Sequence, residues 1–116
     1  MAFDYHRLRD AGFLSDTIET LVVNAVGDKT YIRQIIVHNT GESAETVTLY
    51  RVPDDGGAVG AASLSNRLYN FDVEPNATYT IKLDTPGIIL NDTNDTFQGV
   101  CSSEDVVVIS IDGGRE

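Results

Sequence analysis

Short runs of β-branched and aromatic residues, each closed by a turn sequence, constrain the fold of this chain more than any other feature. The clearest run is "YIRQIIVHN", Tyr31 to Asn39, and "TVTLYRV" and "TYTIKLD" repeat the pattern further on. Between them, "VGDKT", "EPNA" and "TPG" supply the Gly, Pro and Asn residues that turns require. No segment keeps a 3.6-residue period, so we predict an all-β fold with almost no helix.

About eight such runs fit into 116 residues, a spacing typical of sandwiches and jelly rolls. We therefore predict a single antiparallel β-sandwich, jelly-roll or Ig-like, of about eight strands with an N-terminal arm. The chain length and the 41% content of hydrophobic residues suit one compact domain.

Two of the expected strands are apolar on both faces. In the first run, alternation places Ile35 and Val37 on one face and Ile32 and Ile36 on the other. The run 106–111 has valine or isoleucine on both faces as well. A sandwich strand needs only one apolar face. The second face could be covered by a loop or the N-terminal segment of the same chain, or by another subunit.

The first fifteen residues combine large apolar side chains with two arginines. We assign residues 1–15 to an N-terminal arm and residues 16–116 to the sandwich domain. The apolar side chains could wrap their own sandwich, or the arm could lie on a neighbouring molecule. The candidate protein-interface residues are Phe3, Tyr5, Arg7, Leu8, Arg9, Phe13 and Leu14.

The net charge of −10 limits the partners that the surface can attract. Such a surface repels phosphate backbones, so we expect no nucleic-acid binding. From Asp72 onward there are nine acids and only two bases, which would suit a basic protein partner; the alternative is a generic acidic surface that keeps the protein soluble. No apolar run approaches the length of a membrane span, and the N-terminus lacks the apolar centre of a secretory signal. We therefore expect no membrane partner and synthesis in a cytoplasm.

The stretch "NDTND", residues 91–95, gathers four oxygen-bearing side chains around one threonine. An EF-hand loop that began at Asp92 would need glycine and glutamate where Phe97 and Ser103 stand. Asn and Asp favour tight turns, so we predict a hairpin tip. A weak calcium site assembled with Asp54 and Asp55 is the alternative.

Other chemistry-bearing residues are few. The two histidines, His6 and His38, have no metal-ligand spacing, and there is no G-x-S-x-G or phosphate-loop motif. The single cysteine, Cys101, lies in an apolar run that predicts a buried, inert thiol. We predict no catalytic, cofactor-binding or metal-binding residues, no cofactor, and a protein that is not an enzyme.

A linear pattern of strands and turns runs over roughly residues 17–114. It consists of a strand of the form I-V-V-x-N-T, a second of the form V-T-L-Y-x-V-P, a segment of the form I-x-L-x-x-x-D-T-x-x-G and a valine-rich last strand. The matching residues are Ile36, Val37, Asn39 and Thr40; Val47, Thr48, Leu49, Tyr50, Val52 and Pro53; Ile88, Leu90, Asp95, Thr96 and Gly99; and Val106 to Ile111 with Gly113. This pattern resembles small β-sandwich virion proteins of tailed bacteriophages.

This resemblance implies a structural component of the virion, synthesised in the host cytoplasm. We expect a capsid decoration (cement) protein that stabilises the shell by binding the major capsid protein and that forms a homo-oligomer such as a trimer. The alternative is a tail- or fibre-associated module that recognises a host-surface glycan or protein.

Overall fold

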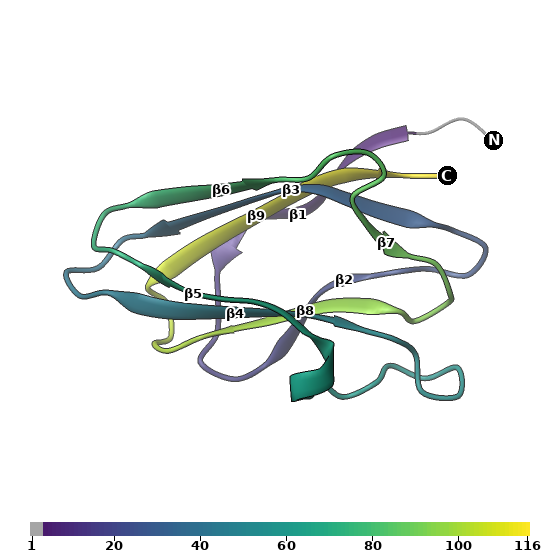
Figure 1. The fold of residues 1–116 in the computed structure, drawn as a ribbon, viewed down its shortest axis with the longest axis horizontal. Helices are drawn as coiled ribbons and strands as arrows, with labels where there is room; N and C mark the ends of the chain where they lie inside the picture. The colour runs from purple at the N-terminus through teal and green to yellow at the C-terminus, as the bar shows by residue number, and fades with distance from the viewer. Residues whose placement is uncertain (1–3) are drawn as a thin grey trace.

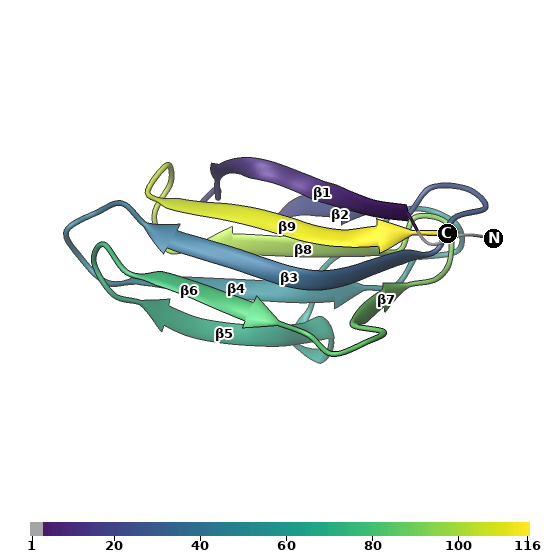
Figure 2. The same cartoon turned by 90° about the horizontal axis from the view of Figure 1, so that it is seen from above.

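The computed structural model describes residues 4–116, with side chains from residue 6 onward, and shows two antiparallel sheets packed face to face (Figure 1). Sheet A has the strand order β1-β9-β3-β6, with β7 paired to one end of β3 (Figure 2). Its strands are β1 (Asp4–Phe13), β3 (Thr30–Asn39), β6 (Thr78–Lys82), β7 (Ile88–Leu90) and β9 (Val107–Arg115).

Sheet B has the order β2-β8-β4-β5 and lies beneath sheet A. Its strands are β2 (Glu19–Val23), β4 (Glu45–Val52), β5 (Arg67–Val73) and β8 (Thr96–Cys101). Within residues 4–116, the only helical element is the 3₁₀ turn η1 (Leu64–Asn66). The predicted single β-sandwich is therefore confirmed, with nine strands where about eight were expected.

The core lies between the inner faces of the two sheets. Phe97 of β8 is the largest fully buried side chain of the described residues, and it packs in one cluster with aliphatic residues of both sheets. In β9, alternate residues are buried from Val107 to Gly113, as a strand with one core face requires. Cys101 belongs to the same cluster and is buried, as predicted.

A one-residue bulge in β3 corrects the expected two-faced pattern. The register with β9 runs from Ile32↔Gly113 directly to Gln34↔Asp112, so Arg33 is an extra residue on β3. Because this residue shifts the alternation by one, Ile32 lies in the core together with Ile35. Only Ile36 remains on the outer face, where it is half-buried.

The N-terminal segment is a strand of the protein's own sheet over residues 4–13. β1 pairs with β9 from Asp4↔Arg115 to Phe13↔Val108, with two irregularities in the register. Leu14 follows β1, donates its backbone N–H to the Val107 carbonyl and is fully buried. Of the two placements left open, the described part of the segment thus shows the first: it wraps its own sandwich. The boundary expected between residues 15 and 16 falls inside this sandwich.

Side-chain contacts between the sheets close both open sides of the sandwich. On one side, Arg9 of β1 lies 3.9 Å from the carboxylate of Glu19 on β2. On the other side, Phe71 of β5 and Tyr79 of β6 stack with ring centroids 6.0 Å apart and an interplanar angle of 11°. Each contact joins the edge strand of sheet A to the edge strand of sheet B.

Replacing Leu14 by alanine tests whether the N-terminal segment belongs to the core. We expect the free energy of unfolding to fall by about 2–5 kcal/mol, the usual cost of truncating a buried leucine. Urea denaturation followed by circular dichroism measures the change.

Phe13→Ala is the matched control, because Phe13 is 47% exposed and its truncation should cost less than about 1 kcal/mol. Equal and small effects of the two substitutions would show that the segment does not contribute to the core. Because Leu14 is buried, deletion of residues 1–14 is expected to destabilise the whole sandwich, so point substitutions are the sharper tool.

Candidate functional site

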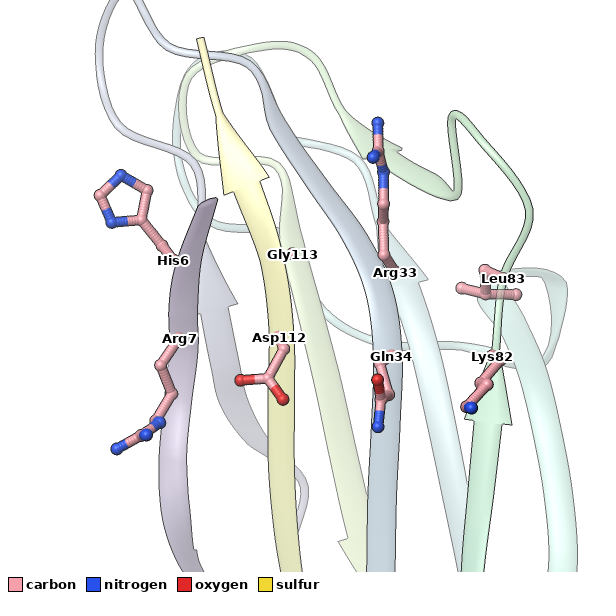
Figure 3. A pocket seen from close by; sticks show the side chains of 8 residues that line it. All are labelled: His6, Arg7, Arg33, Gln34, Lys82, Leu83, Asp112 and Gly113. Carbon is pink, nitrogen blue, oxygen red and sulfur yellow. The ribbon is translucent and has the colours of Figure 1, made fainter. Parts of the chain in front are cut away.

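The outer face of sheet A carries a hollow of about 590 Å³ that is open to solvent (Figure 3). Strands β1, β9, β3 and β6 all contribute to it. Its charged and polar lining residues are His6, Arg7, Arg33, Gln34, Lys82 and Asp112. A volume of this size lies within the range of ligand-binding clefts, although this hollow is a shallow groove on a sheet.

Strand register brings four of these residues into one line across the sheet. Arg7 lies opposite Asp112, Asp112 opposite Gln34, and Gln34 opposite Lys82. Residues that lie directly opposite in antiparallel strands point to the same face. Figure 3 shows the four side chains side by side on β1, β9, β3 and β6. We call Arg7, Asp112, Gln34 and Lys82 the cross-strand row.

The groove has a charge opposite to that of the whole chain. Three of the chain's eight Lys and Arg residues line it, against the single carboxylate of Asp112. The chain as a whole has a net charge of −10. An anionic group of a binding partner is therefore attracted to this groove, whereas the acidic remainder of the surface repels it.

Apolar side chains lie on the same face beside the row. Phe13 is 47% exposed and lies opposite Val108, which is half-buried. Ile36 is half-buried on β3. Its neighbours across the strands are Ser110 of β9 and Thr80 of β6. Partly exposed apolar groups next to a charged row are a composition found at protein interfaces.

The structure divides the predicted interface residues into an outward and an inward group. Arg7 and Phe13 are exposed, whereas Leu8 packs against the core. Leu14 is buried and Arg9 contacts Glu19 across the sandwich edge, as described above. Phe3 lies outside the described residues, and only the backbone of Tyr5 is described.

Sequence reasoning missed Gln34, Lys82 and Asp112, which complete the row. They come from three strands far apart in the sequence, so no local motif marks them. The alternation of "TYTIKLD" did place Lys82 on a polar face, and this was the only signal available. Which residues lie opposite Lys82 depends on strand order and register, and a single sequence does not state them.

The acidic stretch 91–95 is an arch between the two sheets and not a hairpin tip. β7 belongs to sheet A and β8 to sheet B, so the strands on either side of the stretch do not pair. The hairpin prediction is therefore wrong. Both strands are apolar and end in turn residues, a pattern that a hairpin and an inter-sheet arch share.

Asp95 fixes this arch to the loop that follows β4. Its Oδ1 accepts a hydrogen bond from the Asp54 backbone N–H at 2.9 Å. Its Oδ2 accepts bonds from the backbone N–H groups of Asn91 and Asp92, at 3.2 and 3.0 Å. Burial alone would raise the pKa of Asp95, but these hydrogen bonds to the charged form together lower it.

Three carboxylates meet at this end of the sandwich. Asp54, Asp92 and Asp95 each have an oxygen within 4.8 Å of the other two, and Asp54 was part of the calcium alternative considered from the sequence. The backbone N–H groups around Asp95 already direct their positive ends at its carboxylate. The same groups would oppose a cation there.

Comparisons with known proteins give no family for this chain. No protein-family model, no curated protein and no solved structure matches it. Within residues 4–116, no helix is long and apolar enough to cross a membrane. The class that the fold defines is therefore a two-sheet β-sandwich, and its function is inferred from its surface.

Asp95→Ala should destabilise the protein by about 1–2 kcal/mol at neutral pH, because three N–H donors lose a partly exposed charged acceptor. Because the pKa of Asp95 is lower in the folded state, its carboxylate stabilises the fold at pH values above 3.8, the ordinary pKa of aspartate. This stability is lost as the pH falls through the lower folded-state value. Urea denaturation measures the free energy of unfolding of wild type and variant. The difference between the two should shrink at pH values below the folded-state pKa of Asp95.

Asp92→Ala is the control, because Asp92 belongs to the same cluster and is exposed. It should leave the stability unchanged or raise it slightly by removing a like charge. Equal destabilisation by both substitutions would contradict the role given to Asp95.

Calcium should not bind the three-carboxylate cluster with the micromolar affinity of sensor sites. The physical reason is the set of backbone N–H donors that already surrounds Asp95. Isothermal titration of the protein with CaCl₂ measures this. Stoichiometric micromolar binding that is lost in Asp54→Asn would overturn the prediction.

Proposed function

We propose that this protein is a structural component of a tailed-phage particle, a capsid decoration protein that binds neighbouring shell proteins through the outer face of sheet A. The observation that carries the proposal is the combination of partly exposed apolar side chains and the cross-strand row on that one face. The sequence resemblance to phage virion sandwiches supports the phage assignment.

Two of the residues that carry the resemblance, Asn39 and Gly99, have clear structural roles in this sandwich. The Asn39 side chain donates to the carbonyls of Ser43 and Val73 and accepts the Gly41 N–H, which shapes the β3–β4 turn. Gly99 lies so close to Leu21 and Leu49 that an added Cβ would come within 2.9 Å of their methyl groups. These residues specify a fold, so the resemblance supports a shared architecture, and the binding role rests on the face of sheet A.

The alternative role, recognition of a host-surface glycan from the tail, would need accessible aromatic platforms. Phe71 and Tyr79 at the β5–β6 edge stack with ring centroids 6.0 Å apart, and Tyr79 is 37% exposed. The chain has no tryptophan to add to such a platform, and this favours the decoration role over glycan recognition.

A particle-binding assay tests the proposal. Purified protein is added to shells of its own virus, and the co-sedimenting fraction is measured across concentrations. We expect saturable binding that Phe13→Asp weakens by about tenfold or more, because a charge replaces an apolar contact at an interface.

Leu68→Asp is the matched control: Leu68 is 48% exposed, almost the same as Phe13, but lies on β5 of sheet B. This variant should bind as the wild type does. The proposal fails if the wild-type protein does not sediment with shells, and the assignment to sheet A fails if only Leu68→Asp loses binding.

A further inference from the structure

The cross-strand row presents three polar side chains with no internal partners. The side chains of Asp112, Gln34 and Lys82 make no hydrogen bond or ion pair with other described residues. Arg7 has only an exposed contact with Asp10 at 3.4 Å, and such contacts contribute little and exchange readily. The row can therefore bind an external group without first breaking a buried interaction.

The spacing of the two cations matches an extended chain laid across the strands. Arg7 on β1 and Lys82 on β6 are separated by two intervening strands, β9 and β3. With neighbouring strands about 4.8 Å apart, the two positions lie roughly 14 Å apart. An extended peptide advances about 3.4 Å per residue, so residues four apart lie at nearly the same distance and on one face.

We propose that the row binds an extended acidic segment of a partner protein in which two carboxylates are four residues apart. This inference rests on the proposed function and names the chemistry of the partner. Arg7 would bind one carboxylate, in the bidentate manner that guanidinium allows, and Lys82 would bind the other as a point charge. Between them, Asp112 and Gln34 favour a residue that is uncharged or basic, because Asp112 would repel a third carboxylate.

The charge distribution selects a short protein segment over a broad anionic surface. A nucleic acid or an anionic membrane would bring phosphates close to other parts of a chain whose net charge is −10, as well as to the row. At physiological salt, charges beyond about 8 Å are largely screened, so a narrow segment responds mainly to the row itself. Asp112 in the middle of the row further disfavours a continuous line of phosphates.

A second copy of this chain lacks a suitable segment. Among its 18 acids, only Asp112 and Glu116 are four residues apart. Asp112 is already a member of the row, and the Glu116 carboxylate accepts a hydrogen bond from the Tyr31 hydroxyl at 2.6 Å. The occupant that the charges fit is therefore a different protein.

The test uses two synthetic peptides of identical composition, built from Ser, Thr and two Glu. One has its glutamates four residues apart, and the other has them adjacent. Binding is measured by amide chemical-shift titration of the ¹⁵N-labelled full chain. The spaced peptide should bind about fivefold more tightly than the adjacent one, as two surface ion pairs allow. The shifts should centre on the four residues of the row.

Lys82→Glu should abolish this preference, and Arg7→Glu should do the same from the other end of the row. Lys29→Glu is the matched control: it makes the same change of charge at an exposed lysine in the β2–β3 loop and should leave binding unchanged. Circular dichroism confirms that each variant is folded.

Three outcomes would overturn the inference: equal binding of the two peptides, unchanged binding in Lys82→Glu, or stronger binding of inorganic phosphate or phosphatidylglycerol vesicles at the same amides. The shell-binding assay separates this failure from failure of the proposed function. If shells bind Lys82→Glu with the same affinity as wild type, the decoration role is retained and the row is not part of the shell contact. Peptide binding without shell binding would retain the row and reject the decoration role.

Discussion

The one-residue bulge at Arg33 is the constraint on which much of sheet A depends. It places Ile32 in the core beside Ile35, and it sets the register that aligns Gln34 with Asp112. It also lies where the neighbour of β3 changes from β7 to β6, and the Arg33 carbonyl accepts the Leu83 N–H at that junction. An added Cβ at Gly113 would collide with the Tyr31 carbonyl. Glycine at this position therefore permits β9 to approach β3 closely beside the bulge.

The bulge connects the core to the proposed binding face. Successive side chains of a strand point to opposite faces of the sheet. Burial of Ile111 in the core therefore places Asp112 on the outer face. The same register places Gln34 and Lys82 beside it. The row is thus held by the pairing of four strands, and its geometry is as rigid as the sheet. Its cations act locally, because the acidic remainder of the protein is screened over longer distances.

Local sequence patterns predict some elements of the fold and not others. The alternation of Tyr79, Ile81 and Leu83 against Thr80 and Lys82 correctly assigned their two faces, since Ile81 and Leu83 pack against the core. The apolar N-terminal segment was recognised, but its role as β1 depends on an unpaired edge of β9 that the sequence does not display. The acidic stretch 91–95 has the turn chemistry of a hairpin, and this chemistry is the same whether a chain returns to its own sheet or crosses to the other.

The order of the residues alone is enough to predict short strands, one buried core and an acidic surface. These properties follow from periodicity and composition, which are local or additive. The folded chain adds which strands are neighbours, where the register shifts by one residue and which charges lie side by side. Those properties depend on contacts between residues as distant as Arg7 and Asp112. One inserted residue, such as Arg33 in β3, exchanges the inward and outward faces of a strand. Such a bulge can be recognised only when the strand is seen paired with its neighbour.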